Sequence, residues 1–225
     1  MRGTGVASLA TLERGTGGPY VSMITVATET DGTPLFLISN LALHTRNLQA
    51  DPRASILFVA GNELQDPLAL GRVSVMGHAE KAETGLARTR FLARHPEAEV
   101  YAGFADFAIW RLRVDKGHFV GGFGRIGTIA GDQLVRKDTA LSAWEAEISR
   151  VLNDVNARYG SRLAQLAAQR GHKAGDWRLA ACDPEGGELL SAGTAIRLVF
   201  AEPILDLAGI PQALERLAAL HDARN

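Results

Sequence analysis

The chain has 225 residues, of which 46% are hydrophobic, and a formal net charge of −1 at pH 7. This length leaves room for two small domains, and the near-zero charge excludes bulk attraction to nucleic acid or to an anionic membrane. No apolar run approaches the roughly 20 residues needed to cross a bilayer, and the N-terminus lacks a signal-peptide core, so we expect a cytoplasmic protein. One cysteine, Cys182, excludes an internal disulfide, and no Cys/His spacing predicts a metal site.

The first half of the chain is predicted to be mostly β-strand. Residues 1–18 are rich in Gly, Thr and Ser, and we predict a flexible arm there with one short helix at Val6 to Glu13. The segments that follow are mostly alternating and bounded by Gly, Pro, Asn or Asp, which predicts strands. These segments are residues 21–28, 35–39, 55–60, 72–80, 105–114 and 118–121. Together they suit a small closed sheet.

Helical patterns interrupt and follow these strands. A short helix that stops before Pro52 is expected, and residues 84–94 are predicted to form an amphipathic helix. The polar residues 131–141 predict a connection into a second domain. There, Ser142 and Glu145 form a capping box that opens a helix with a break at Tyr159-Gly160. Three strands and a last helix follow at residues 177–182, 188–190, 195–200 and 210–220.

The most informative stretch lies between the second and third predicted strands. Its polar residues fall within a few positions of a helix N-terminus, where free N–H groups and the helix dipole favour a phosphate. They are Ser39, Asn40, His44, Thr45, Arg46 and Asn47. Ser22 and the cation Arg72 would join them if the strands pair as a hairpin. The alternative left open is that these residues only terminate secondary structure and that Arg72 is a solvated strand charge.

Several motifs in consistent order resemble one known family. They are Pro19 to Ser22, Ser39-Asn40 through His44 to Leu48, Asp51 to Arg53, Gly71 to Gly77, and Trp110 leading to Val120 through Arg125. The chain resembles the pyridoxamine 5′-phosphate oxidase-like FMN-binding proteins, and within them the HugZ-like haem-utilisation branch. The resemblance implies an α+β fold: an FMN-binding split β-barrel at 1–135, then a small α/β domain at 142–225 built as helix, antiparallel sheet and helix.

The resemblance also implies a site. It implies a homodimer whose FMN site lies at the subunit interface, with Ser22 on the phosphate strand, His44 at the place of a family lysine and Arg72 at that of a polar flavin contact. Arg125, in a glycine-rich loop, is a candidate contact for a haem propionate or a substrate carboxylate. The full set of expected cofactor-binding residues is Ser22, Ser39, Asn40, His44, Thr45, Asn47, Arg72, Trp110 and Arg125.

The chain departs from the family in ways that bear on activity. Ser22 and His44 replace strongly basic phosphate ligands, and residues 119–128 lack the stretch that holds pyridoxamine phosphate, so oxidation of that substrate is not expected. The branch commonly carries a histidine-containing pattern on the first helix of the second domain, but residues 151–156 contain no histidine. The remaining candidates for a haem ligand are His118 and His221.

No nucleophile or carboxylate-pair signature is present, so we assign no catalytic residue and expect any chemistry to come from a bound cofactor. The first hypothesis is an FMN-dependent oxidoreductase related to haem-utilisation proteins. The alternative is a non-catalytic dimer that either binds haem or another tetrapyrrole or has a regulatory role. A cofactor-free dimer that acts through its surface also stays open.

Overall fold

The fold is known from a computed structural model that divides into two compact units, Met1–Lys137 (unit 1) and Asp138–Asn225 (unit 2). None of the described helices is long and apolar enough to cross a bilayer. The structure describes the whole chain except residues 62–65, 67, 83–84, 123, 139–140 and 223–225 and the side chains of 142–143 and 220–222.

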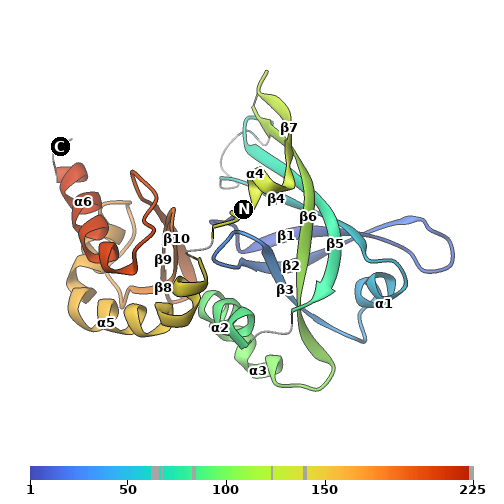
Figure 1. The fold of residues 1–225 in the computed structure, drawn as a ribbon, viewed down its shortest axis with the longest axis horizontal. Helices are drawn as coiled ribbons and strands as arrows, with labels where there is room; N and C mark the ends of the chain where they lie inside the picture. The colour runs from blue at the N-terminus through green and yellow to red at the C-terminus, as the bar shows by residue number, and fades with distance from the viewer. Residues whose placement is uncertain (62–65, 67, 83–84, 123, 139–140, 223–225) are drawn as a thin grey trace. The chain divides into compact units, whose positions relative to one another are not determined.

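In the part of the chain that the structure describes, unit 1 forms a closed six-stranded barrel with one extra strand. Its strands are β1 (Val6–Leu12), β2 (Pro19–Thr28), β3 (Pro34–Ser39), β4 (Arg53–Val59), β5 (Gly71–Lys81), β6 (Phe107–Gly121) and β7 (Ile126–Ala130). The order is β3-β2-β1-β4-β5-β6-β7, all pairs are antiparallel, and an additional β3–β6 pairing closes the barrel. Figure 1 shows β7 continuing the sheet beyond β6.

The barrel is held by a core of alternating inward side chains. Leu9, Phe36, Ile56 and Leu112 come from four different strands, and none of them has exposed surface. Burial of each such side chain contributes about 1.5–3 kcal/mol. Because side chains alternate between the two faces of a strand, the residues between these core positions form the outer face of the barrel.

Two predictions for this region were wrong in detail. The segment predicted as a helix at Val6 to Glu13 is strand β1, which pairs with β2 on one side and β4 on the other. Its buried residues Ala7, Leu9 and Thr11 recur every second position, a period that suits a strand and not a helix. The predicted strands 105–114 and 118–121 are one strand, β6, which carries a β-bulge opposite Met76 and Gly77.

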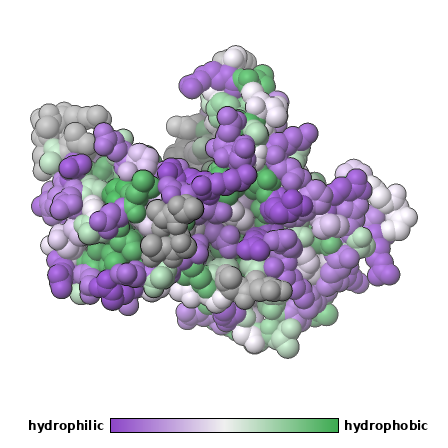
Figure 2. Space-filling view, viewed as in Figure 1, coloured by the Kyte–Doolittle hydropathy of each residue, from purple (hydrophilic) through white to green (hydrophobic). Residues whose placement is uncertain are grey.

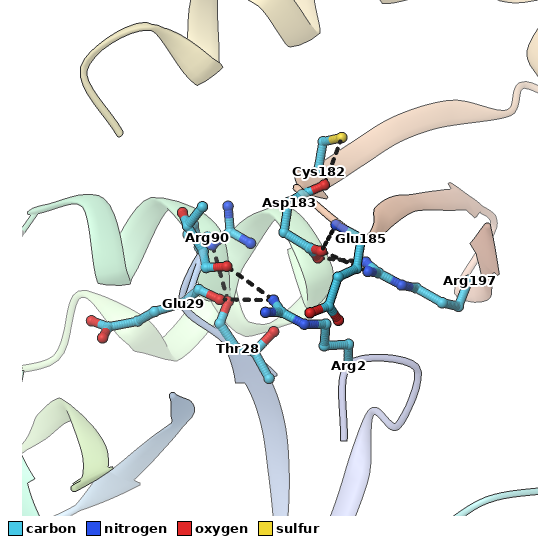
Figure 3. Close-up of polar contacts among 9 residues, drawn as sticks. Arg2, Thr28, Glu29, Arg90, Cys182, Asp183, Glu185 and Arg197 are labelled. Carbon is cyan, nitrogen blue, oxygen red and sulfur yellow. Dashed lines mark hydrogen bonds and ion pairs between the residues drawn. The ribbon is translucent and has the colours of Figure 1, made fainter. Parts of the chain in front are cut away.

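Short helices cover parts of the barrel. They are α1 (Leu43–Ala50), α2 (Gly85–Arg94), η1 (Pro96–Ala98), α3 (Glu99–Ala102) and α4 (Gly131–Leu134). Helix α2 packs Ala87 and Phe91 against a second apolar cluster that includes Leu35 and Ile109. On the same helix the nearly buried Arg90 donates from Nε to the carbonyl of Thr28 at 3.0 Å, as Figure 3 shows.

Unit 2 is a long helix, a small antiparallel sheet and a final helix. Its elements are α5 (Leu141–Ala168), β8 (Arg178–Asp183), β9 (Gly186–Ser191), β10 (Thr194–Val199), η2 (Leu207–Gly209) and α6 (Ile210–Asp222). The predicted break is a kink at Tyr159 (φ −117°, ψ 15°), after which the helix resumes. The capping-box side chain of Ser142 lies outside the described residues. The predicted fold class, a split barrel followed by a small α/β domain, is confirmed.

One buried ion pair joins two strands of the small sheet. Arg197 donates to Asp183 through both terminal nitrogens, at 2.6 and 2.8 Å, and Figure 3 shows the guanidinium facing the carboxylate. Asp183 is only 1% exposed. The two-pronged geometry satisfies both carboxylate oxygens, which is the condition under which a buried charge is tolerated.

Candidate functional site

The structure brings together two of the predicted site residues at α1. The hydroxyl oxygen of Ser22, on β2, lies 3.0 Å from Nδ1 of His44, in the first turn of α1. The other ring nitrogen, Nε2, is buried without a partner among the described residues. Burial lowers the pKa of His44 below its usual value of 6.5. The imidazole is therefore neutral at neutral pH and offers a phosphate no positive charge.

The turn before α1 is fixed by Ser39, Asn40 and Asp106. The Ser39 hydroxyl donates to the Asp106 carboxylate at 2.5 Å and accepts the N–H of Leu41 at 3.0 Å. The backbone N–H of Asn40 donates to the carbonyl of Asp106 at 2.7 Å. The N-cap position, Ala42, has no capping side chain, and the first turn of α1 contains no acidic residue. The first N–H groups of this helix thus remain available to an anion.

Thr45 and Asn47 have structural contacts instead of an open face. Both are fully buried. The Thr45 hydroxyl donates to the Ser39 carbonyl at 2.6 Å, while the Asn47 amide donates to the Thr11 hydroxyl and accepts the N–H of Arg14, each at 3.1 Å. These bonds hold α1 against the ends of β1 and β3, so the side chains have no exposed group to offer a ligand.

Arg72 does not join this cluster within one chain. It lies opposite Val59 on the outer face of the barrel, three residues before the buried Val75, whereas Ser22 lies opposite the fully buried Leu9 on the inner face. Its guanidinium donates to carbonyls of the preceding segment at 3.3 Å. Within one chain Arg72 therefore does not lie beside Ser22, and its place in a cofactor site shared between subunits stays a prediction.

The other expected residues are dispersed. Trp110 is 4% exposed in the barrel core, and its Nε1 is buried with no partner in the described residues. Arg125 is exposed in the turn between β6 and β7, where its carbonyl accepts the N–H of Gly121 at 2.7 Å. His118 is exposed on β6, with Nδ1 3.5 Å from the Thr128 hydroxyl. His221 lies on α6, and its side chain is outside the described residues.

A cleft of about 380 Å³ opens on the outer face of the barrel, across β1, β4, β5 and the bulge of β6. Its walls are partly apolar and partly polar, and we call it the outer-face cleft. It is lined by Ala10, Thr11, Leu12, Pro19, Arg53, Ala54, Ser55, Met76, Gly77, His78 and Asp115. The strand register accounts for the grouping, because Arg53 on β4 lies directly opposite His78 on β5.

Charged groups gather at one side of the outer-face cleft. Nδ1 of His78 lies 3.0 Å from a carboxylate oxygen of Asp115. Arg53 donates to both carboxylate oxygens of Asp51, at the end of α1, and these bonds hold the pKa of Asp51 at about 2. The cleft therefore combines an imidazole with a carboxylate beside it, a guanidinium at its edge and apolar walls, and the last two suit a flat apolar ligand with anionic substituents.

Sequence reasoning missed His78 and Asp115. The alternation of β5 already placed Met76 and His78 on one face, which was a usable signal. The bulge that directs Asp115 toward His78 has no signature in the sequence, because it depends on how two distant strands pair.

Unit 2 has a cleft of its own, of about 480 Å³, between α5 and the segment leading into α6. Figure 2 shows hydrophobic side chains gathered on the visible face of unit 2 between these two helices. Trp144 lines the cleft and donates from Nε1 to the carbonyl of Leu205 at 2.7 Å. Arg150 also lines this cleft of unit 2, and it pairs with Glu147 at 2.7 Å and with Asp154 at 3.6 Å. Among the described residues, no cluster of three or more His, Cys, Asp or Glu side chains could hold a metal ion.

Comparison with known proteins places the barrel in a family. A model described as "CREG, beta-barrel" matches residues 2–136. The chain belongs to this family. The resemblance to pyridoxamine 5′-phosphate oxidase-like split barrels of the haem-utilisation branch is confirmed.

Two solved structures are similar over nearly the whole chain. The protein Atu2129 of Agrobacterium tumefaciens, of unknown function, is 31% identical, with a TM-score of 0.80 over 95% of this chain and 89% of its own. A haem-binding protein from Mycobacterium smegmatis is 30% identical, with a TM-score of 0.55 over 98% of this chain and 93% of its own. Both units therefore have counterparts in one known architecture.

Two curated relatives match about half of this chain. The haem oxygenase HutZ of Vibrio cholerae is 31% identical over 126 residues, which is 53% of this chain and 71% of HutZ. The non-canonical haem oxygenase HOZ of Arabidopsis thaliana is 32% identical over 109 residues, or 47% of this chain. The match spans only 33% of the length of HOZ.

Proposed function

We propose that this protein binds haem in the outer-face cleft, as a member of the haem-utilisation branch. The observation that carries the proposal is the cleft itself, which presents an imidazole and a guanidinium beside apolar walls. Haem is a flat apolar ring with an iron that prefers His, Cys, Met or Tyr ligands and two carboxylates that pair with Arg. The similarity to a haem-binding protein over 98% of this chain supports the same ligand.

A titration of the purified full chain with haem tests this proposal. Absorbance in the Soret region is expected to shift and saturate, beyond the signal of haem in buffer alone. FMN is titrated in parallel and the protein is then desalted. Retention of FMN, together with a haem signal no different from the buffer control, would reject haem as the ligand.

The second candidate, an FMN-dependent oxidoreductase, has its own supporting observation. The uncapped N-terminus of α1, the orphaned Nε2 of His44 and the hydroxyl of Ser22 form a donor set that suits a phosphate. Arg46, exposed on α1, adds one cation. Because His44 is neutral, we expect this set to bind a dianion weakly. A bound flavin would supply the redox chemistry, while these residues would orient its phosphate.

We further propose that the protein is a homodimer. Exposed apolar side chains lie on the outer face of β2 and β4, the two strands that flank β1, including Val21 (62% exposed) and Met23 (77%) on β2 and Leu57 and Val59 on β4. A contiguous exposed patch of this kind marks an association surface. This patch adjoins the outer-face cleft, since Val21 and Ser55 both lie opposite Ala10. Sedimentation of the wild type and of Met23→Glu tests it, with a dimer expected to become a monomer.

Turnover of the bound haem is the finer proposal, because HutZ and HOZ are named haem oxygenases. The reaction would consume O₂ and electrons from an added reductant such as ascorbate. Loss of the Soret band with release of iron, measured against a catalase-containing control, would support it. A stable Soret band would leave the protein as a haem binder without turnover.

A further inference from the structure

The two ring nitrogens of His78 have different surroundings. Nδ1 is buried and lies 3.0 Å from Oδ2 of Asp115, within ion-pair distance but without the geometry of a hydrogen bond. The side chain as a whole is nevertheless 39% exposed. Nε2 is not among the buried atoms, and no described residue bonds to it, so the exposed edge of the ring is the Nε2 edge. His78 therefore presents a free nitrogen at the lining of the outer-face cleft.

A β-bulge places Asp115 beside this histidine. On β6, Lys116 lies opposite Met76 and Val114 opposite Gly77, so Asp115 is the extra residue between two paired positions. A bulge of this kind re-aims a side chain out of the regular ladder. The bulge also brings backbone very close, since a Cβ on Gly77 would lie 2.0 Å from the carbonyl oxygen of Arg113. Glycine at position 77 thus permits the arrangement that orients His78.

We infer that His78 is the protein ligand to the haem iron, bound through Nε2, and that Asp115 is its positioning residue; this inference rests on the proposed haem binding. One bond forms, from the Nε2 lone pair to the iron, and a water on the iron leaves. No proton is released, because the neutral tautomer with hydrogen on Nδ1 leaves a lone pair on Nε2, and the Asp115 carboxylate 3.0 Å from Nδ1 favours that tautomer. Metal-bound histidines commonly donate their second N–H to a carboxylate, which fixes ring orientation and raises ligand basicity.

The surroundings of the cleft suit the rest of the ligand. Leu12 and Met76 supply apolar surface for the ring. Arg53, opposite His78 in the strand register, lies at the edge with its side chain 65% exposed. A propionate can compete for this guanidinium because the Arg53–Asp51 pair is exposed and weakly held. Neither His118 nor Arg125 lines this cleft.

Absorption spectra and affinities of haem-loaded full-length variants test the inference. In His78→Ala we expect the absorption spectrum typical of a histidine-ligated haem to be lost and the affinity for haem to fall by roughly tenfold or more. Added imidazole should restore the wild-type spectrum. His118→Ala removes an exposed histidine on the neighbouring strand, and we expect its spectrum to match the wild type. His78→Gln repeats the test with a side chain of similar size, and circular dichroism checks that each variant is folded.

The positioning role of Asp115 has a separate readout. Asp115→Asn should keep the histidine ligand but lower the iron–histidine stretching frequency in the resonance Raman spectrum of the ferrous protein, because the amide removes the negative charge that lies 3.0 Å from Nδ1. If the wild type binds haem and His78→Ala leaves its spectrum unchanged, the ligand assignment fails while haem binding stands. Loss of the histidine-ligated haem spectrum in His118→Ala would likewise reject His78 as the iron ligand without rejecting haem binding. If the wild type binds no haem, both proposals fall.

Discussion

Replacing Asn47 distinguishes a structural role of this residue from the cofactor-binding role expected from sequence. In Asn47→Ala, the fully buried amide and its two hydrogen bonds of 3.1 Å, to the Thr11 hydroxyl and from the Arg14 N–H, are lost. Each bond contributes about 0.5–1.5 kcal/mol, and the Thr11 hydroxyl, only 3% exposed, is left unsatisfied at a cost of about 1–3 kcal/mol. Together they predict a destabilisation of about 2–6 kcal/mol.

The assay must report on the barrel alone, because the chain has two units. Amide hydrogen exchange of β1 and α1, read by mass spectrometry, isolates the affected region. We expect faster exchange in both elements of Asn47→Ala. Arg46→Ala, an exposed neighbour on the same helix, should change stability by less than about 0.5 kcal/mol. Wild-type exchange in Asn47→Ala, combined with lost FMN binding, would refute the structural role.

Three further predictions concern backbone approach, the buried ion pair and pH. Gly77→Ala would place a Cβ 2.0 Å from the Arg113 carbonyl oxygen. We expect the free energy of unfolding, measured by urea titration, to fall by more than about 3 kcal/mol, or the variant to be insoluble. An unfolding midpoint equal to that of the wild type would contradict the bulge geometry. Arg197→Met leaves the buried Asp183 carboxylate without its cation and should lower the stability of unit 2 by about 3–5 kcal/mol. Protection of the small sheet from amide hydrogen exchange measures this loss, and unchanged protection would show that the ion pair is dispensable. His44 has a lower pKa folded than unfolded, so the folded chain binds fewer protons and stability should fall as pH drops below 6.5. Thermal melts between about pH 5 and 7 should show a melting temperature that depends less on pH in His44→Gln than in the wild type. An equal dependence of the melting temperature on pH in both proteins would contradict the burial of the His44 ring.

The sequence predicted the architecture well where patterning is local. Alternating segments such as β2 and β5 read as strands because one face is buried, and Tyr159-Gly160 marked the kink in α5. Strand β1 was mistaken for a helix because its small residues, such as Ala7 and Ala10, have no strong strand preference by themselves. Its conformation is decided by pairing with two neighbours, which is non-local information.

The site was predicted less completely for the same reason. The Ser22–His44 contact followed from a hairpin and a turn close in sequence. The face on which Arg72 lies could not be predicted, because a shift of one residue in strand register changes the face of every side chain. The polarity of Thr45 and Asn47 suggested ligands, yet both are buried and bonded within the fold. The pairing of His78 with Asp115 depends on a bulge, and sequence patterning does not specify bulges.

Haem affinity after the outer-face cleft is blocked tests the central claim most directly. Ser55 lines the cleft on β4, whereas Ser74, on the adjacent strand and the same outer face, does not line it. A bulky indole in Ser55→Trp should occupy the cleft and weaken haem binding by roughly tenfold or more, about 1.4 kcal/mol. Ser74→Trp should bind haem like the wild type. Equal affinity in Ser55→Trp and the wild type, measured in one Soret titration series, would contradict haem binding at this cleft.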